Sequence, residues 1–216
     1  AFTRIGKDIV MAVKEGGPNP ETNARLRAVI QNAKAANMPK DNVERAIKKA
    51  SEKDSAHYKE VLFEGYGPHG IAFLVETATD NNNRTVANVR AAFNKCNGAL
   101  GTSGSVVFMF DHTCNFRVKK EDLKMDLEEF ELELIDFEVE EIFEDEDGIL
   151  IYAPFEKFGA IQKFIEDSNM EILSSGFERI PTTLKKLNEA EQEEVEKLLE
   201  RLEEEDDVQY VYHNME

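Results

Sequence analysis

Lysine and arginine side chains recur at helical spacing in the first 50 residues of the chain. Along residues 2–15, Arg4, Lys7 and Lys14 fall within roughly 80° of one another, taking 100° per residue, on the side opposite an apolar stripe. Cationic side chains in such a row can neutralise the phosphates of a nucleic-acid backbone. No aromatic side chains alternate with these charges, so the pattern predicts phosphate contacts rather than base stacking.

Two further helices, expected at about 22–36 and 41–50, carry similar charges. In the second of them, Asp41 and Glu44 have the spacing of a capping box. Three short helices with short connections predict a small helical bundle. An ordinary solvated surface is the alternative interpretation of its basic faces. The candidate phosphate-binding residues are Arg4, Lys7, Lys14, Arg25, Arg27, Lys34, Arg45, Lys48 and Lys49.

Charge is distributed unevenly along the 216 residues, whose net charge is −18. Residues 1–60 hold 12 basic and 8 acidic side chains, residues 61–110 hold 3 of each, and residues 111–216 hold 11 basic and 33 acidic side chains. A polyanion would be repelled by the last of these segments. If the chain binds one, the first segment must face it.

Residues 64–110 have the most regular patterning and almost no net charge. Apolar runs at 71–75 and 105–110 predict two strands, and residues 85–96 have a helical pattern. The polar loops at 65–70, 80–84 and 98–104 are therefore the places where this region could present functional groups.

The loop at residues 80–84 is expected to start the helix, because Asn and Asp readily cap helices. Arg84 lies where the positive end of the helix dipole disfavours a cation. Its guanidinium therefore requires an anionic partner, either a carboxylate of the chain or an external phosphate. We include Asn83 and Arg84 among the candidate nucleic-acid-binding residues.

Two glycine-rich loops resemble nucleotide-binding motifs in spacing only. Residues 65–70 spell G-x-G-x-x-G, but a predicted strand follows them and Pro68 removes one N–H, so we expect a tight connection between strands. Residues 101–104 lack the lysine of a P-loop and also precede a predicted strand. We interpret this second loop as a turn, with contact to an anion as the alternative.

Catalytic and metal-binding patterns are not found. Cys96 and Cys114 fall on different predicted elements and are expected to be buried, reduced thiols. His112 and Cys114 form an isolated pair without the spacing of a metal site, and residues 144–147 lack the spaced ligands of a calcium loop. No nucleophile and base have a plausible spacing, so we expect no enzyme, no metal and no cofactor.

Membrane segments are not predicted either. No apolar run reaches the roughly 20 residues that a membrane-spanning helix requires, and residues 1–15 lack the apolar block of a signal peptide. We therefore expect a cytoplasmic protein without a membrane partner.

The acidic part of the chain predicts a second folding pattern. Residues 116–180 have the order strand, helix, strand, strand, helix, strand, which is that of a ferredoxin-like unit. The last segment predicts a helix with Asn188 and Glu191 at capping-box spacing and a strand at 208–212. Because a lone helix and strand need a sheet to join, we expect this segment to return to the central domain.

The sequence thus predicts an α+β protein of three domains: a small N-terminal helical bundle and two α/β ferredoxin-like domains, the third inserted within the second. The expected bounds are 1–54 for the helical domain, 55–111 with 181–216 for the central domain, and 112–180 for the inserted acidic domain.

Several long motifs stand in order along the chain: KEGGPNPETNARLRAVIQNAKAANMPKDNVERAIKKA, EGYGPHGIAFLVETATDNNNRTVANVRAAF, GALGTSGSVVFMF and DDVQYVYHN. On these motifs the chain resembles the YebC/PmpR family, whose relatives include the mitochondrial translational activator of cytochrome c oxidase subunit I. The resemblance implies the three-domain architecture above and no known catalytic activity. Family members usually open with a basic segment containing His, Lys and Trp, whereas this chain begins Ala1-Phe2-Thr3 and has no Trp. We expect part of the nucleic-acid surface to lie in such a segment.

Three functions remain open at this stage. The resemblance and the charge distribution favour a DNA-binding transcriptional regulator that contacts promoter DNA. The overall acidity favours ribosomal RNA and a ribosome-associated translation factor, because a structured RNA can reward shape over bulk charge. A protein-interaction scaffold is the third hypothesis, since ferredoxin-like folds host varied functions.

Overall fold

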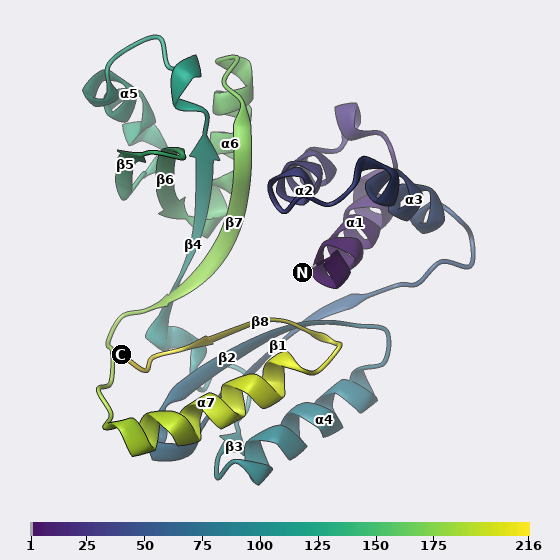
Figure 1. Cartoon of the computed structure of the whole chain (residues 1–216), viewed down its shortest axis with the longest axis vertical. Coiled ribbons are helices and arrows are strands. Elements are labelled where there is room, and N and C mark those ends of the chain that lie inside the picture. Colours follow the sequence, from purple (N-terminus) through teal and green to yellow (C-terminus); the bar gives the residue numbers. More distant parts are fainter. Residues whose placement is uncertain (1) are drawn as a thin grey trace. The chain divides into compact units, whose positions relative to one another are not determined.

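The computed structural model describes residues 2–216 and divides into two compact units. The first unit combines the residues up to Ser55 with His112–Glu178, and the second combines Ala56–Asp111 with Arg179–Glu216. Helices and two four-stranded sheets make up these units, so the fold class is α+β, as predicted from the sequence (Figure 1).

Three helices form the N-terminal part of the first unit: α1 (Phe2–Gly16), α2 (Ala24–Ala35) and α3 (Lys40–Ala50). Their apolar faces share one core, which includes Ile9, Leu26 and Val43. The buried Asn23 joins the first two helices, because its side chain caps Leu26 N and donates to the carbonyl oxygen of Ala12 at 2.8 Å. The helical bundle is thus confirmed.

The capping prediction for α3 is wrong. The N-cap is Pro39, which has no side chain that could accept a hydrogen bond, and Asp41 lies inside the first turn. Because Asp41 lies two residues beyond the N-cap, it cannot cap the helix, and its carboxylate can favour α3 only through the helix dipole. The capping box of Asn188 and Glu191 is confirmed, at the start of α7 (Glu189–Glu203).

The second part of the first unit is a sheet with strand order β5-β6-β4-β7. Along the chain its elements are β4 (Phe110–Val118), α5 (Leu127–Leu134), β5 (Glu141–Asp145), β6 (Gly148–Pro154), α6 (Phe158–Asp167) and β7 (Ile172–Pro181). This is the predicted order of a ferredoxin-like unit. Phe116, Phe130 and Ile161 lie in its core. A separate 3-10 turn at Lys120–Asp122 precedes helix α5.

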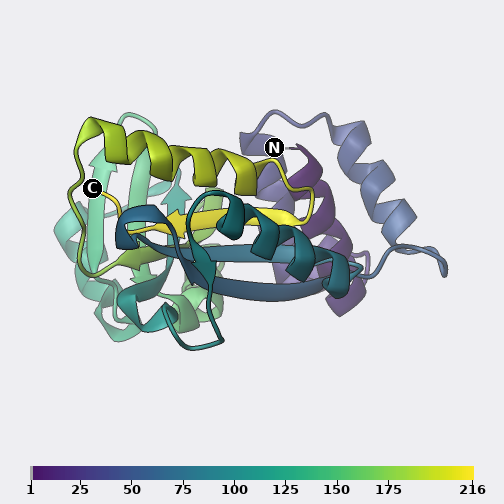
Figure 2. The same cartoon turned by 90° about the horizontal axis from the view of Figure 1, so that it is seen from below.

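The sheet of the second unit has the order β3-β1-β2-β8. Its strands are β1 (Lys59–Tyr66), β2 (Ala72–Thr79), β3 (Ala99–Leu100) and β8 (Val208–His213). Helices α4 (Asn82–Lys95) and α7 cover the same face of this sheet (Figures 1 and 2). The chain end therefore joins the central sheet as an edge strand. Since β1 and β2 form a hairpin at its centre, the chain order differs from that of the other sheet.

Apolar side chains cover both faces of the second unit's sheet. Phe73 of β2 meets Phe93 of α4 edge to face on the helical side, with 5.9 Å between the ring centroids. Leu74, the next residue of β2, points to the opposite side and packs with Val106 and Phe110. This alternation is that of a strand buried on both faces.

The strand predicted at residues 105–110 is wrong. A 3-10 turn occupies Val107–Met109, and only Phe110 enters a strand, β4. The reason is the carboxylate of Glu64, which accepts the N–H groups of Val106 and Val107 at 2.9 and 2.7 Å. Those N–H groups are consequently not available for a strand ladder.

No helix within residues 2–216 combines the length and the apolar character needed to cross a membrane.

Candidate nucleic-acid interface

Helix α3 presents three cations to solvent. Arg45, Lys48 and Lys49 are all exposed and span an arc of about 100° on the helix, while Val43 and Ala50 are buried. Lys48 and Lys49 lie in the last turn, where the negative end of the helix dipole favours cations. The sequence prediction thus placed these three side chains on an accessible face.

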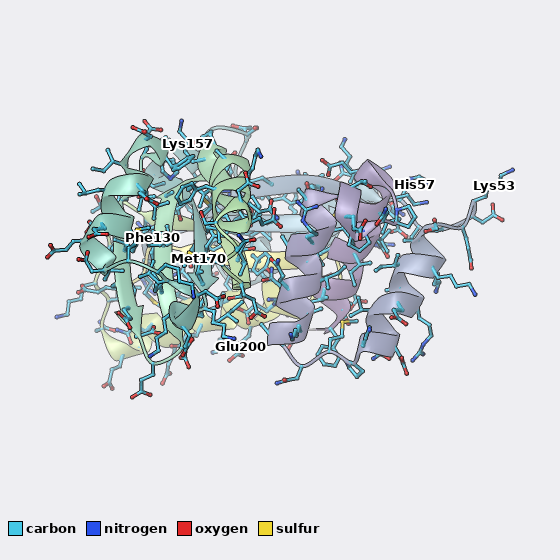
Figure 3. All side chains as sticks on the ribbon, turned by 90° about the horizontal axis from the view of Figure 1, so that it is seen from above. Lys53, His57, Phe130, Lys157, Met170 and Glu200 are labelled. Carbon is cyan, nitrogen blue, oxygen red and sulfur yellow. The ribbon has the colours of Figure 1, made fainter. Side chains whose placement is uncertain are left out.

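Two exposed lysines flank this face and were not among the predicted residues. Lys40 opens α3 with its side chain 88% exposed, 4.0 Å from Glu44, and Lys53 stands out from the segment that follows the helix (Figure 3). Both lie within five positions of Arg45, Lys48 or Lys49 along the chain. Their proximity in the sequence was the signal that could have identified them.

The cations of α1 are less accessible than the sequence pattern indicated. Lys7 is only 9% exposed, and Arg4 is half-buried. The ammonium group of Lys14 donates to the hydroxyl of Ser55, beyond the end of α3. This row of cations therefore forms part of the packed helical bundle instead of an open face.

Helix α2 carries two arginines that pair with carboxylates. Arg25 contacts Glu15 at 2.5 Å, and Arg27 makes two hydrogen bonds, of 2.8 and 3.0 Å, to the carboxylate of Glu166 on α6. The hydrogen bond that Arg27 donates to Glu166 raises the pKa of Arg27, although partial burial opposes this. The Arg27 guanidinium also donates to the carbonyl oxygens of Pro20 and Glu21.

Lys34 differs from these two arginines. Its side chain is 84% exposed, and its nearest carboxylate, that of Glu171, is 3.9 Å away. Such a pair in solvent holds its partners weakly. Lys34 therefore remains accessible to an external anion, together with the cations of α3.

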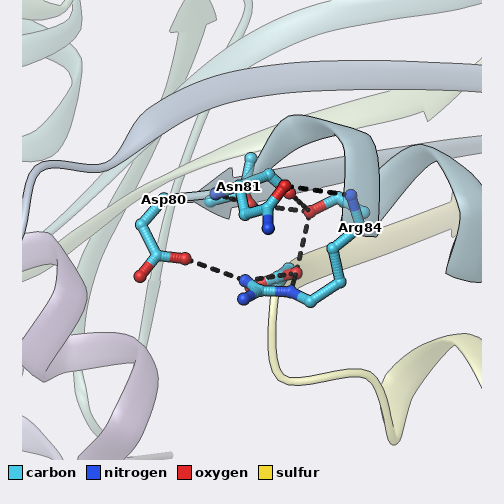
Figure 4. A network of polar contacts seen from close by, with 6 residues as sticks. Asp80, Asn81 and Arg84 are labelled. Atoms are coloured by element: carbon cyan, nitrogen blue, oxygen red, sulfur yellow. Dashed lines mark hydrogen bonds and ion pairs between the residues drawn. The ribbon is translucent and has the colours of Figure 1, made fainter.

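Arg84 is paired with carboxylates of the chain, which satisfies the requirement for an anionic partner at the start of a helix. Its guanidinium donates to both oxygens of the buried Asp207 and to Asp80 at 2.9 Å (Figure 4). Asp207 also accepts the hydroxyl of Thr85 at 2.7 Å, so the network joins the start of α4 to the turn before β8. Hydrogen bonds to Asp207 and Asp80 raise the pKa of Arg84.

The Arg84 network favours a structural role for this side chain over the phosphate contact. Asn81 caps α4 by accepting from Arg84 N at 3.1 Å, as expected of an Asn in this loop. Asn83 is exposed on the first helical turn. Arg84 is exposed as well, but its guanidinium is engaged by two carboxylates.

The G-x-G-x-x-G loop connects β1 to β2, which confirms the prediction of a strand-to-strand connection. His69 within it adopts a left-handed conformation, with φ 62°, and its ring contacts Glu194 at 2.7 Å. Lys185 donates to the carbonyl oxygen of His69. These contacts attach the loop to the segment 185–194, and nothing in them forms a dinucleotide site.

Metal and thiol chemistry have little support in the structure. Within residues 2–216, no cluster of three or more His, Cys, Asp and Glu side chains could hold a metal ion. Cys96 and Cys114 are free thiols, and burial raises the pKa of Cys114 to about 12. A thiol with this pKa stays protonated at neutral pH and is a poor nucleophile.

Comparison with known proteins identifies the family. A model described as "TACO1/YebC protein N-terminal domain" matches residues 1–53, and one described as "TACO1/YebC second and third domain" matches residues 58–215. A "Probable transcriptional regulatory protein" of Flavobacterium johnsoniae is 74% identical over 99% of this chain and 90% of its own length. A relative of the same description from Flavobacterium psychrophilum is 72% identical over 100% of this chain and 91% of its own length.

A solved structure agrees with this match. The crystal structure of a conserved hypothetical protein from Aquifex aeolicus superposes with a TM-score of 0.77 at 37% identity, covering 100% of this chain and 88% of the other. Both family models together span most of the sequence. The chain belongs to the TACO1/YebC family.

Proposed function

We propose that this protein is a non-enzymatic regulator of gene expression that binds nucleic acid, as a DNA-binding transcriptional regulator, through the exposed cations of α3 and through Lys34. The carrying observation is the accessibility of Arg45, Lys48 and Lys49 on one face of a chain whose net charge is −18. Phosphate neutralisation by such cations supplies most of the affinity in sequence-independent binding. Its relatives' description as probable transcriptional regulatory proteins supports the same role.

In this proposal each of the three domains has a separate role. Residues 1–54 carry the nucleic-acid contacts, residues 55–111 with 181–216 form the central scaffold, and residues 112–180 form an acidic domain that points away from the polyanion. Like charges enforce this orientation, since 20 acidic and 6 basic side chains lie between residues 112 and 178. The cytoplasm, where two free thiols persist, is the compartment we propose.

Ribosomal RNA is the second candidate target, and one observation favours it. The exposed cations are few, whereas general DNA binders usually present a large basic surface. A structured RNA on the ribosome can be recognised largely by shape. The protein would then act as a translation factor instead of a transcriptional regulator.

Crosslinking in cells, followed by sequencing of the bound nucleic acid, tests the proposal directly. Promoter fragments are the expected product for a transcriptional regulator, and ribosomal RNA is expected for a translation factor. Co-sedimentation of the full-length protein with ribosomes at low salt provides the second readout. The matched variant is Arg45→Glu, Lys48→Glu, Lys49→Glu. If the wild type recovers no more DNA or RNA than this variant does, nucleic-acid binding through α3 is overturned.

A further inference from the structure

The sheet β5-β6-β4-β7 of the first unit presents apolar side chains on the face opposite its core. Ile149 and Ile151 of β6 lie in that core, together with residues of α5 and α6. Because side chains alternate along a strand, Leu150 and Tyr152 point to the opposite face. Opposed residues on neighbouring strands share a face, so Phe143 of β5, opposite Leu150, lies there as well. Leu150, Tyr152 and Phe143 join none of the apolar cores formed within residues 2–216.

Two aromatic rings form a pair on this face. Phe143 is 38% exposed and Tyr152 is partly exposed. Their ring centroids lie 6.4 Å apart, with an angle of 25° between the ring planes. The two residues are diagonal neighbours across β5 and β6, a separation that aromatic side chains can span. Such a pair presents π-electron surface that carries a partial negative charge.

Carboxylates flank Tyr152 on both sides. The exposed Glu141 lies directly opposite it on β5. On the other side, Asn115 of β4 opposes Tyr152 and donates to the carboxylate of Glu178 at 3.1 Å. Burial raises the pKa of the Tyr152 phenol, and the charges of Glu178 and Glu141 raise it further, although Arg117 opposes this. Both carboxylates are therefore close enough to act on the aromatic pair.

Two cations near this face are already engaged within the chain. Arg117 of β4, opposite Leu150, donates to the carboxylate of Asp145 at 2.8 Å. Lys120 donates to the carbonyl oxygen of Asp145 at 3.3 Å. A nucleic-acid base could stack on the exposed rings, but the 20 acidic side chains between residues 112 and 178, against 6 basic ones, would repel its phosphates. The charge of this face therefore matches a cationic ligand.

We propose that this sheet face binds an arginine-rich segment of a partner protein. A guanidinium group stacks on aromatic rings and donates paired hydrogen bonds to a carboxylate, which is the chemistry that Phe143, Tyr152 and Glu141 offer together. The negative charge of residues 112–178 attracts such a segment from a longer distance. This binding is independent of the nucleic-acid contacts of α3 and gives the acidic domain a role of its own.

Fluorescence anisotropy of the full-length protein with a labelled peptide in which arginine and glycine alternate tests the proposal. The wild type should bind this peptide at low salt. It should bind a peptide with lysine in place of arginine more weakly, because an ammonium group lacks the planar fork of arginine. A peptide with glutamate in place of arginine should not bind.

Variants of the aromatic pair test the stacking contact. Tyr152→Leu should weaken binding of the arginine peptide about 2- to 30-fold, because it keeps an apolar side chain but loses the cation–π contact. Tyr152→Phe should bind within about twofold of the wild type, since it retains the ring. Phe143→Ala, at a more exposed position, should also weaken binding, and it provides the test if Tyr152→Leu does not fold.

A matched pair of charge variants separates this face from the bulk acidity of the domain. Glu141→Gln should weaken binding of the arginine peptide about 1.5- to 5-fold, whereas Glu131→Gln, the same change at an exposed position of α5, should leave it unchanged. Equal losses in these two variants, or equal affinities of the wild type, Tyr152→Leu and Phe143→Ala, would overturn the proposal. Failure of the wild type to bind the arginine peptide would do the same. So would binding of an unstructured single-stranded RNA that Tyr152→Leu abolishes, because the face would then stack bases.

Discussion

Helix α3 and the pair formed by α1 and α2 all carry lysine and arginine side chains, but only α3 exposes most of its cations. Arg45, Lys48 and Lys49 face solvent. In contrast, Lys7 is buried in the bundle and Arg27 is engaged by Glu166. The difference teaches that helical spacing predicts which cations share a face, whereas packing decides whether that face can receive a phosphate.

The largest expected effect concerns α3. Reversing the charge of its three exposed cations, in the variant Arg45→Glu, Lys48→Glu, Lys49→Glu, should weaken binding to nucleic acid more than about 100-fold at low salt, because attraction to phosphates becomes repulsion. Thermal unfolding should change little, since exposed positions tolerate substitution. Fluorescence anisotropy with a labelled duplex and a labelled single strand measures the affinity.

A matched control variant tests whether the position of the cations or the total charge of the protein governs binding. The variant Lys124→Glu, Lys157→Glu, Lys163→Glu makes the same change of net charge in the acidic part of the first unit. It should retain the affinity within about threefold, because these lysines are not among the proposed contacts and salt screens exposed charges. An equal loss in both variants would show that total charge, and not the face of α3, governs binding.

The second prediction concerns Arg27 of α2, which is ion-paired with Glu166. Arg27→Ala should lower the free energy of unfolding by about 1–3 kcal/mol, since it leaves Glu166 partly buried without its partner. Affinity for nucleic acid should stay within about threefold, as expected for a structural side chain. Chemical denaturation and the same anisotropy assay test both statements, and a stable but non-binding variant would contradict them.

The third prediction concerns a buried anion, Glu64, and the pH dependence of the free energy of unfolding. Its pKa is lower in the folded protein than its ordinary value of 4.5. The stabilisation is therefore complete above the unfolded-state pKa and is lost as the pH falls through the folded-state pKa. Glu64→Gln should be destabilised by about 1–3 kcal/mol at pH 7, since it loses charge-assisted hydrogen bonds.

Denaturation of both proteins between neutral and acidic pH checks this assignment. The difference in unfolding free energy between the wild type and Glu64→Gln should shrink as the pH falls below about 4.5, because the wild type then becomes neutral at this position too. A difference that stays constant through this range would show that Glu64 does not act through its charge.

The smallest effect is expected at Arg25. Its ion pair with Glu15 is largely exposed, with side-chain exposures of 37% and 63%. Arg25→Ala should therefore change the free energy of unfolding by about 0–1 kcal/mol. A loss as large as that of Arg27→Ala, in the same denaturation series, would mean that exposure does not distinguish the two arginines of α2.

Local patterns predicted much of the fold. Apolar stripes located the helical bundle, the ferredoxin-like order of the acidic segment was read from alternating strands and helices, and Asn188 with Glu191 marked a helix start. These features depend on residues a few positions apart. Short-range physics therefore sufficed to find them.

The errors arose where a distant residue controls the backbone or a charge. The strand expected at 105–110 fails because Glu64, more than 40 positions away for Val106 and Val107, takes their N–H groups. Likewise, the partner of Arg27 lies 139 positions further along the chain. Spacing within one segment contains no information on such partners, which only the tertiary structure supplies.

The salt dependence of binding tests the central claim most directly. Affinities of the wild type, of Arg45→Ala, Lys48→Ala, Lys49→Ala, and of the control Lys124→Ala, Lys157→Ala, Lys163→Ala are measured across a salt series. The slope of log affinity against log salt should become shallower by about 2 to 3 in the α3 variant, because each lost phosphate contact releases about one counterion fewer. It should be unchanged in the control. Equal slopes for all three proteins would contradict binding through α3.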